Sequence, residues 1–136
     1  MHLCLALAVV VTLAACAPGG TGATRFNGTW TRDGGELKVW ALDERRLRVE
    51  FRGEYEYESS QGPLVNVGTG AGDAAVEDGA ATFRPVDADD DCRITLRPAG
   101  ERLEVSETGE CGFGLNVTAA GTYQRVSAAE PQFESP

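Results

Sequence analysis

Apolar and polar side chains alternate along much of the sequence between residues 26 and 126. In the longest such stretch, 47–59, one face carries Leu47, Val49, Phe51, Gly53, Tyr55 and Tyr57, and the other carries Arg48, Glu50, Arg52, Glu54, Glu56 and Glu58. Successive side chains of a strand point to opposite faces, so this pattern predicts one long strand with an apolar inner face and a charged outer face. Gly53 leaves a gap on the inner face, where the strand can bend.

Shorter stretches at 36–41, 81–84, 92–97 and 102–106 alternate in the same way. Turn-forming residues lie between the stretches, at Asp33-Gly34-Gly35, Asp78-Gly79, Asp87–Asp91 and Ala99-Gly100. Strands about 8–12 residues apart and joined by hairpin turns indicate an antiparallel meander. We therefore predict an all-β, up-and-down antiparallel barrel of about eight strands, filled by side chains such as Phe51, Tyr55, Tyr57 and Phe83.

The Gly- and Ala-rich stretch 65–76 is harder to interpret. Its small side chains predict either a very tightly packed strand or a segment that is partly a loop. We expect the barrel domain to cover residues 26–126. Residues 127–136 are rich in Ala, Glu and Pro, and we expect them to form a disordered tail.

The N-terminal apolar segment is too short to cross a bilayer as a helix. Residues 3–15 carry no charge, and a transmembrane helix needs roughly 20 apolar residues. The segment ends in Leu13-Ala14-Ala15-Cys16, which resembles the bacterial lipobox. This resemblance implies a signal peptide at 1–15, lipidation at Cys16 and a flexible tether over 16–25. An ordinary signal peptide and a buried N-terminal helix are the alternatives.

The resemblance to lipoproteins also implies a location. Ala17, and not Asp, follows Cys16, a pattern that in lipoproteins of double-membrane bacteria goes with the outer membrane. The protein would then be anchored there by its lipid, facing the periplasm. Met1-His2 carries no Lys or Arg, so a basic segment encoded upstream of this start is an open alternative.

Two cysteines remain once Cys4 leaves with the signal peptide and Cys16 is lipidated. In an exported protein, we expect Cys92 and Cys111 to form a disulfide between two neighbouring strands. Two free buried thiols are the alternative. We expect no metal site, because the mature chain has no histidine and two thiols do not complete a tetrahedral zinc shell.

The two ends of the predicted barrel share a Gly-Thr-aromatic sequence. Gly28-Thr29-Trp30 opens the domain, and Gly121-Thr122-Tyr123-Gln124-Arg125 closes it. The pair resembles the calycin arrangement, in which a Gly-x-Trp near the start packs against an arginine on the last strand. This resemblance implies a lipocalin-like barrel in which Arg125 stacks on Trp30. The residues implied to close the barrel are Gly28, Trp30, Gly121, Tyr123 and Arg125.

A second resemblance covers about residues 26–126. The run from Cys92 to Arg97, Leu103-Glu104-Val105, Glu110-Cys111-Gly112-Phe113-Gly114 and Gly121-Thr122-Tyr123 look like a small β module of bacterial lipoproteins. Some bearers of this module are associated with lipoproteins of the lysozyme-inhibitor type. Gly112, Phe113 and Gly114 are a candidate partner-binding loop with an exposed aromatic. The alternative is a glycine-flanked bend in which the disulfide and Phe113 lock the last hairpin.

The charge balance restricts the partners. The formal net charge is −9, from 21 acidic and 12 basic residues, and this excludes a basic nucleic-acid-binding surface. An acidic surface attracts cationic proteins, although the same charge can serve solubility alone. The acidic turn Asp87–Asp91 is either a solvated turn or a weak cation site. It lacks the glycine and glutamate of a calcium loop.

Catalytic chemistry has little support in this sequence. The mature chain has no histidine, no unpaired cysteine and no phosphate-binding glycine loop. We therefore expect no enzyme activity and no cofactor. The interpretation we favour is a monomeric, lipid-anchored envelope protein with a non-catalytic binding module, whose partner is a cationic protein such as lysozyme. A carrier of a small apolar ligand and a structural accessory protein without a soluble ligand are the alternatives.

Overall fold

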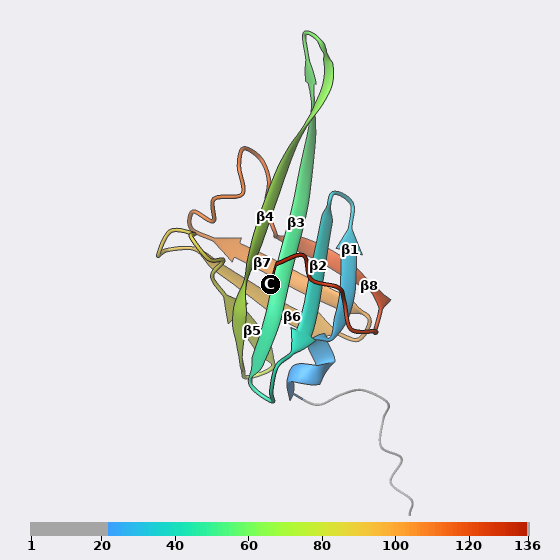
Figure 1. The fold of residues 1–136 in the computed structure, drawn as a ribbon, viewed down its shortest axis with the longest axis vertical. Helices are drawn as coiled ribbons and strands as arrows, with labels where there is room; N and C mark the ends of the chain where they lie inside the picture. The colour runs from blue at the N-terminus through green and yellow to red at the C-terminus, as the bar shows by residue number, and fades with distance from the viewer. Residues whose placement is uncertain (1–21, 136) are drawn as a thin grey trace, which may run out of the picture.

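The computed structural model describes residues 22–135, so the predicted signal peptide, Cys16 and most of the tether lie outside the described residues. A short 3-10 helix, η1 (Gly22–Phe26), precedes the strands (Figure 1). The strands are β1 (Gly28–Arg32), β2 (Gly35–Ala41), β3 (Arg46–Ser59), β4 (Gly62–Glu77), β5 (Ala80–Phe83), β6 (Arg93–Ala99), β7 (Arg102–Thr108) and β8 (Gly121–Ser127). Consecutive strands pair antiparallel, and β1 also pairs with β8, so the sheet closes. The predicted all-β, eight-stranded barrel is confirmed.

Inward-pointing side chains fill the barrel. Leu47, Val49 and Phe51 of β3 are completely buried, as the alternation of the sequence predicts. The largest fully buried side chains from the whole domain are Trp30, Tyr123, Phe26, Phe51, Leu37, Leu47, Ile94, Leu96 and Leu103. Burial of each aliphatic or aromatic side chain contributes about 1.5–3 kcal/mol to folding. In the described part of the chain, the interior is therefore a packed core.

The strand β4 resolves the uncertainty over residues 65–76, because all of them are strand. Its inner face is made of small residues, with Gly68, Gly70 and Gly72 paired opposite the inner face of β3. A Cβ atom on Gly68 would collide with the carbonyl oxygen of Phe113, and one on Gly70 would lie 2.7 Å from the Phe113 ring. The glycines therefore let the loop after β7 pass directly over β4.

The hairpin of β3 and β4 extends beyond the rest of the barrel as a two-stranded ribbon (Figure 1). Pairing of β3 with β2 stops at Gly53, whereas pairing with β4 continues to Ser59 and Gly62. Tyr55 and Tyr57 are consequently 41% and 38% exposed. The prediction that these two tyrosines fill the interior is wrong, because their face of the strand has left the barrel.

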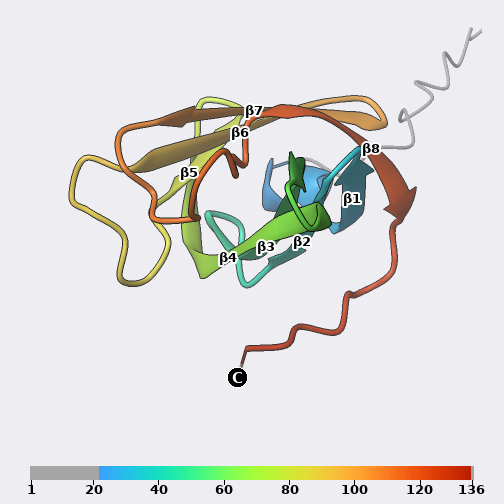
Figure 2. The same ribbon diagram turned by 90° about the horizontal axis from the view of Figure 1, so that it is seen from above.

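The folded domain is longer at both ends than predicted. Residues 22–25, assigned to the tether from the sequence, belong to η1, and Ala23 is buried in the core. The residues after β8 do not form the expected disordered tail. They cross the outer side of β2 and β3, where Lys38 Nζ donates a hydrogen bond of 2.9 Å to the carbonyl of Gln132 (Figures 1 and 2).

Candidate binding surfaces

The seam between β1 and β8 brings the two halves of the calycin-like pattern together. Trp30 and Arg125 are register partners, and the Arg125 guanidinium lies 4.3 Å from the centre of the Trp30 ring. Arg125 also donates hydrogen bonds to the carbonyls of Asn27, at 2.7 Å, and Arg25, at 3.0 Å. The Trp30 indole donates to the Phe26 carbonyl at 2.9 Å. Arg125 therefore fastens η1 to the end of the barrel and plays a structural part.

The other end of this seam holds a second arginine on an aromatic ring. Arg32 lies 5.2 Å from the centre of the Tyr123 ring, and a Cβ atom on Gly121 would lie 2.7 Å from the Arg32 Cδ. The Tyr123 hydroxyl donates to the Ala119 carbonyl at 2.7 Å, and burial raises the pKa of this hydroxyl. The sequence pattern did not identify Arg32.

Gly28, at the start of β1, must be glycine, because its φ is 127° and a Cβ atom would collide with the Ser127 carbonyl.

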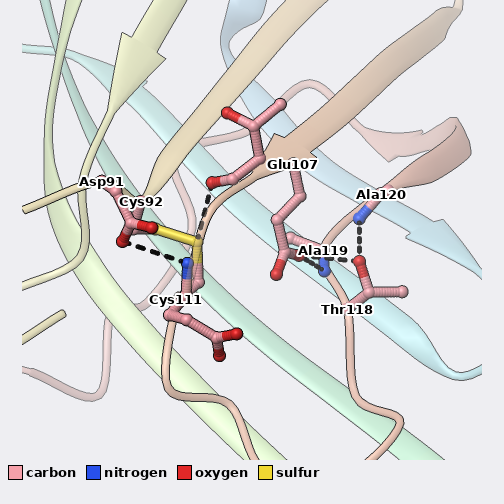
Figure 3. Close-up of a disulfide and its surroundings, with 9 residues drawn as sticks. Asp91, Cys92, Glu107, Cys111, Thr118, Ala119 and Ala120 are labelled. Carbon is pink, nitrogen blue, oxygen red and sulfur yellow. Dashed lines mark hydrogen bonds between the residues drawn. A yellow bond between two sulfur atoms is a disulfide. The ribbon is translucent and has the colours of Figure 1, made fainter. Parts of the chain in front are cut away.

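The predicted disulfide is confirmed (Figure 3). Cys92 directly precedes β6 and Cys111 follows β7, with a Cα–Cα distance of 4.9 Å. The link therefore ties together the open end of the β6–β7 hairpin just outside its paired strands. An Asp91 carboxylate oxygen accepts a hydrogen bond of 3.2 Å from the Glu110 amide and braces the same corner.

The candidate loop after Cys111 does not display its aromatic residue. Phe113 is buried and meets Phe51 edge-on, with 4.8 Å between ring centres. Gly112 and Gly114 have φ angles of 76° and 98°, which turn the chain into and out of the barrel mouth. This corrects the interpretation of Gly112, Phe113 and Gly114 as an exposed partner loop. Instead, Phe113 plugs the barrel beside the disulfide.

The acidic turn 87–91 has neighbours that suit a solvated turn. Asp90 forms an ion pair of 2.6 Å with Arg84, and Asp91 is engaged with the Glu110 amide. Across residues 22–135, no group of three or more His, Cys, Asp or Glu side chains is placed to hold a metal ion.

The ribbon, defined here as residues 53–68, exposes apolar and acidic side chains together. One of its faces carries Tyr55 and Tyr57 of β3, paired with Asn66 and Leu64 of β4. The other face carries Glu54, Glu56 and Glu58, paired with Val67, Val65 and Pro63. The ribbon contains no basic residue. It is therefore a projecting element with exposed apolar side chains and a uniformly acidic charge.

The base of the ribbon is held against the loop before β8. The Asn66 amide donates a hydrogen bond of 3.0 Å to the carbonyl of Leu115, whose own side chain is 75% exposed. An open groove of about 540 Å³ adjoins this base and is lined by Arg32, Asp33, Gly34, Glu54, Tyr55, Glu56, Val65, Asn116 and Thr118. The sequence contained one signal for the ribbon, because its alternating stretch is twice the length of β2.

Comparisons of the chain with family models, with curated proteins and with solved structures found no match. Within residues 22–135, no helix has the length and apolar character needed to cross a membrane.

Proposed function

We propose that this protein is a lipid-anchored, non-catalytic binding module of the bacterial cell envelope, and that its ribbon binds a cationic protein. Lysozyme is the first candidate partner, by the resemblance of the sequence to lipoproteins of the lysozyme-inhibitor type. The observation that carries the proposal is the ribbon itself, which exposes two tyrosines on one face and three carboxylates beside aliphatic side chains on the other. Exposed aromatic side chains are enriched at protein-binding surfaces.

The charge of the ribbon supports a basic partner. Glu54, Glu56 and Glu58 follow one another on a single face, and within residues 22–135 only Glu54 of these three forms an ion pair, with Arg52 at 2.5 Å. Exposed charges of one sign raise the association rate of an oppositely charged protein and make this rate depend on salt. The face that carries Tyr55, Tyr57 and Leu64 would then supply the lasting affinity, because burial of apolar surface does not depend on charge attraction.

The packed interior favours a protein partner over a small ligand. An apolar ligand inside an eight-stranded barrel needs a cavity, and here Trp30, Phe51 and Phe113 occupy the space between the strands. A ligand could enter only if such side chains moved out of a close-packed core.

The lipid anchor at Cys16 is a separate part of the proposal with its own test. A Cys16→Ser chain should remain unprocessed or be released from membranes, because it cannot receive the diacylglyceryl group. Membrane fractionation with mass measurement distinguishes the outcomes. Recovery of the variant in the membrane fraction at its mature mass would contradict the anchor.

Binding can be tested with a soluble form that starts at Ala17. Every buried apolar side chain of the described structure lies between Ala23 and Tyr123, so this form keeps the whole core. Interferometry against a c-type lysozyme, at low and physiological salt, should detect binding whose association rate falls with salt. Lytic activity is measured in the same samples. Binding that vanishes at physiological salt, with lysis unaffected, would contradict a specific partner of this class.

Matched variants locate the surface. Replacing Glu54, Glu56 and Glu58 with Gln should slow association, whereas the same change at the exposed Glu77, Glu110 and Glu130 removes equal charge outside the ribbon. Tyr57→Ala should speed dissociation with little effect on the association rate. Equal effects of the two triple variants would contradict the ribbon as the binding element.

A further inference from the structure

The outer face of β2 and β3 holds a short extended segment of the chain, residues 132–135, which we call the C-terminal segment (Figures 1 and 2). Three charged side chains on this face contact it: Lys38 of β2 and Arg48 and Glu50 of β3. Lys38 and Glu50 are register partners, with 3.9 Å between their charged groups. All three point outward because they alternate with buried residues, Leu37 and Val39 of β2 and Leu47, Val49 and Phe51 of β3.

These side chains hold mainly the backbone of the C-terminal segment. The two carboxylate oxygens of Glu50 accept hydrogen bonds from consecutive amides, Glu134 at 2.9 Å and Ser135 at 3.0 Å. Lys38 donates to the Gln132 carbonyl at 2.9 Å, and Arg48 donates to the Ser135 carbonyl. Such charge-assisted bonds are stronger than bonds between neutral groups.

One side chain of the segment is also recognised. The Arg48 guanidinium lies 4.3 Å from the centre of the Phe133 ring, a distance at which the cation is attracted to the face of the ring. The side chain of Glu50 is only 12% exposed, so its bonds to the segment are partly shielded from water. The contacts specify an aromatic residue followed by two residues that each have a free N–H. Proline does not fit at either of these two positions, because it lacks the N–H.

The C-terminal segment can leave without opening the core. Gln132, Glu134 and Ser135 are exposed, Phe133 is only partly buried, and the buried apolar core ends at Tyr123. Lys38, Arg48 and Glu50 stand on paired strands, so the face that they form persists when the segment lifts away. A hollow of about 360 Å³ adjoins Ser135 and is lined by Arg48, Val49, Ala71, Gly72, Asp73 and Val86.

We propose that the outer face of β2 and β3 is a binding site for extended peptide segments, and that the C-terminal segment is its resident, displaceable ligand. The partner is an extended segment of another protein with an aromatic residue followed by two residues other than proline. Such a segment would make the same backbone bonds to Lys38, Arg48 and Glu50. This site lies apart from the ribbon, so the proposal does not rest on the proposed function.

The test uses a labelled peptide with the sequence of residues 128–136 and two versions of the soluble form, the unaltered chain and Phe133→Ala. Phe133→Ala weakens the resident segment and leaves the site itself intact. The resident segment competes with the added peptide, because a short tether gives it an effective concentration of about 1 mM. Phe133→Ala weakens this competition, so the Phe133→Ala chain should bind the peptide about tenfold more tightly than the unaltered chain. Fluorescence anisotropy gives both dissociation constants. Equal affinities of the two chains, or no binding to either, would overturn the proposal.

Altered peptides test the recognition itself. A peptide with Glu134→Pro should lose at least about tenfold in affinity, because it lacks one of the two N–H groups that donate to Glu50, whereas Glu134→Ala should bind almost unchanged. Adding Glu50→Gln to the Phe133→Ala chain should cause a similar loss. If the proline peptide binds as well as the alanine peptide, backbone recognition by Glu50 is wrong.

Displacement can also be followed in the unaltered chain, which avoids any folding defect of a variant. Adding excess peptide to the isotope-labelled chain should move the amide NMR signals of Glu134 and Ser135 to their positions in the free peptide. Signals that stay in place while the peptide binds would show that the peptide binds elsewhere, and this would overturn the proposal.

Discussion

Breaking the Cys92–Cys111 disulfide should lower the free energy of unfolding by about 3 kcal/mol. The two cysteines are separated by 19 residues in the sequence. In the chain-entropy model, a cross-link over a loop of this length lowers the entropy of the unfolded chain by about 11 cal/mol/K. This entropy corresponds to about 3 kcal/mol at about 25 °C. A domain of about 110 residues loses about 4 °C in Tm for each kcal/mol, so we expect a decrease of about 12 °C.

Thermal unfolding followed by circular dichroism measures this difference, with the soluble form in its oxidised and reduced states. The reduced chain keeps every side chain and lacks only the S–S bond, so the comparison isolates the cross-link. A double variant, Cys92→Ala and Cys111→Ala, should melt at or slightly below the reduced chain, because both cysteines are buried and their sulfur atoms also contribute packing. A reduced chain that melts within about 3 °C of the oxidised chain would refute the loop-entropy reasoning.

Three further predictions concern the seam, the inner face of β4 and the C-terminal segment. Arg125→Ala should cost about 2–3 kcal/mol in urea unfolding, because the stack on Trp30 and two hydrogen bonds are lost, and Arg125→Lys should recover part of this. Gly68→Ala should cost about 2 kcal/mol or more in the same assay, because the new methyl group meets the Phe113 backbone. Burial raises the pKa of Glu50, but the two amides of the C-terminal segment and Lys38 outweigh burial and hold this pKa below its ordinary value. The contribution of Glu50 is therefore complete at neutral pH and is lost as the pH falls through this lowered pKa, so the segment's amide NMR signals should shift in acid, and Glu50→Gln should remove the part of this shift that comes from Glu50.

The alternation of side chains predicted the strands well because a barrel strand has one buried and one exposed face. Leu47, Val49 and Phe51 follow this rule completely. Tyr55 and Tyr57 continue the same alternation but are exposed, because the pattern defines a face and contains no information on whether another strand lies opposite. The alternation alone therefore could not distinguish the ribbon from the barrel, and only the unusual length of the stretch pointed to it.

The errors at the two ends of the domain and at Phe113 arise from contacts between distant parts of the chain. The composition of residues 127–136 is typical of disorder. Residues 127–135 are ordered because outward-facing charged side chains on β2 and β3 form hydrogen bonds with this stretch, and those side chains are distant in the sequence. A phenylalanine between two glycines is equally compatible with an exposed loop. Phe113 is buried because the glycines of β4 leave room for it, and this contact is not visible in the local sequence. The disulfide was predictable because it followed from counting cysteines, without reference to geometry.

The closed sheet also determines when the chain is protected from aggregation. Every strand pairing of the barrel joins consecutive strands except that of β1 with β8, which spans nearly the whole domain. Local hairpins form early, whereas the entropy needed to close so long a loop delays the last pairing. Until β8 docks, β1 and β7 each present an unpaired edge to other chains. The barrel is therefore most vulnerable just before its final strand arrives, and the contact of Arg125 with Trp30 marks the end of that period.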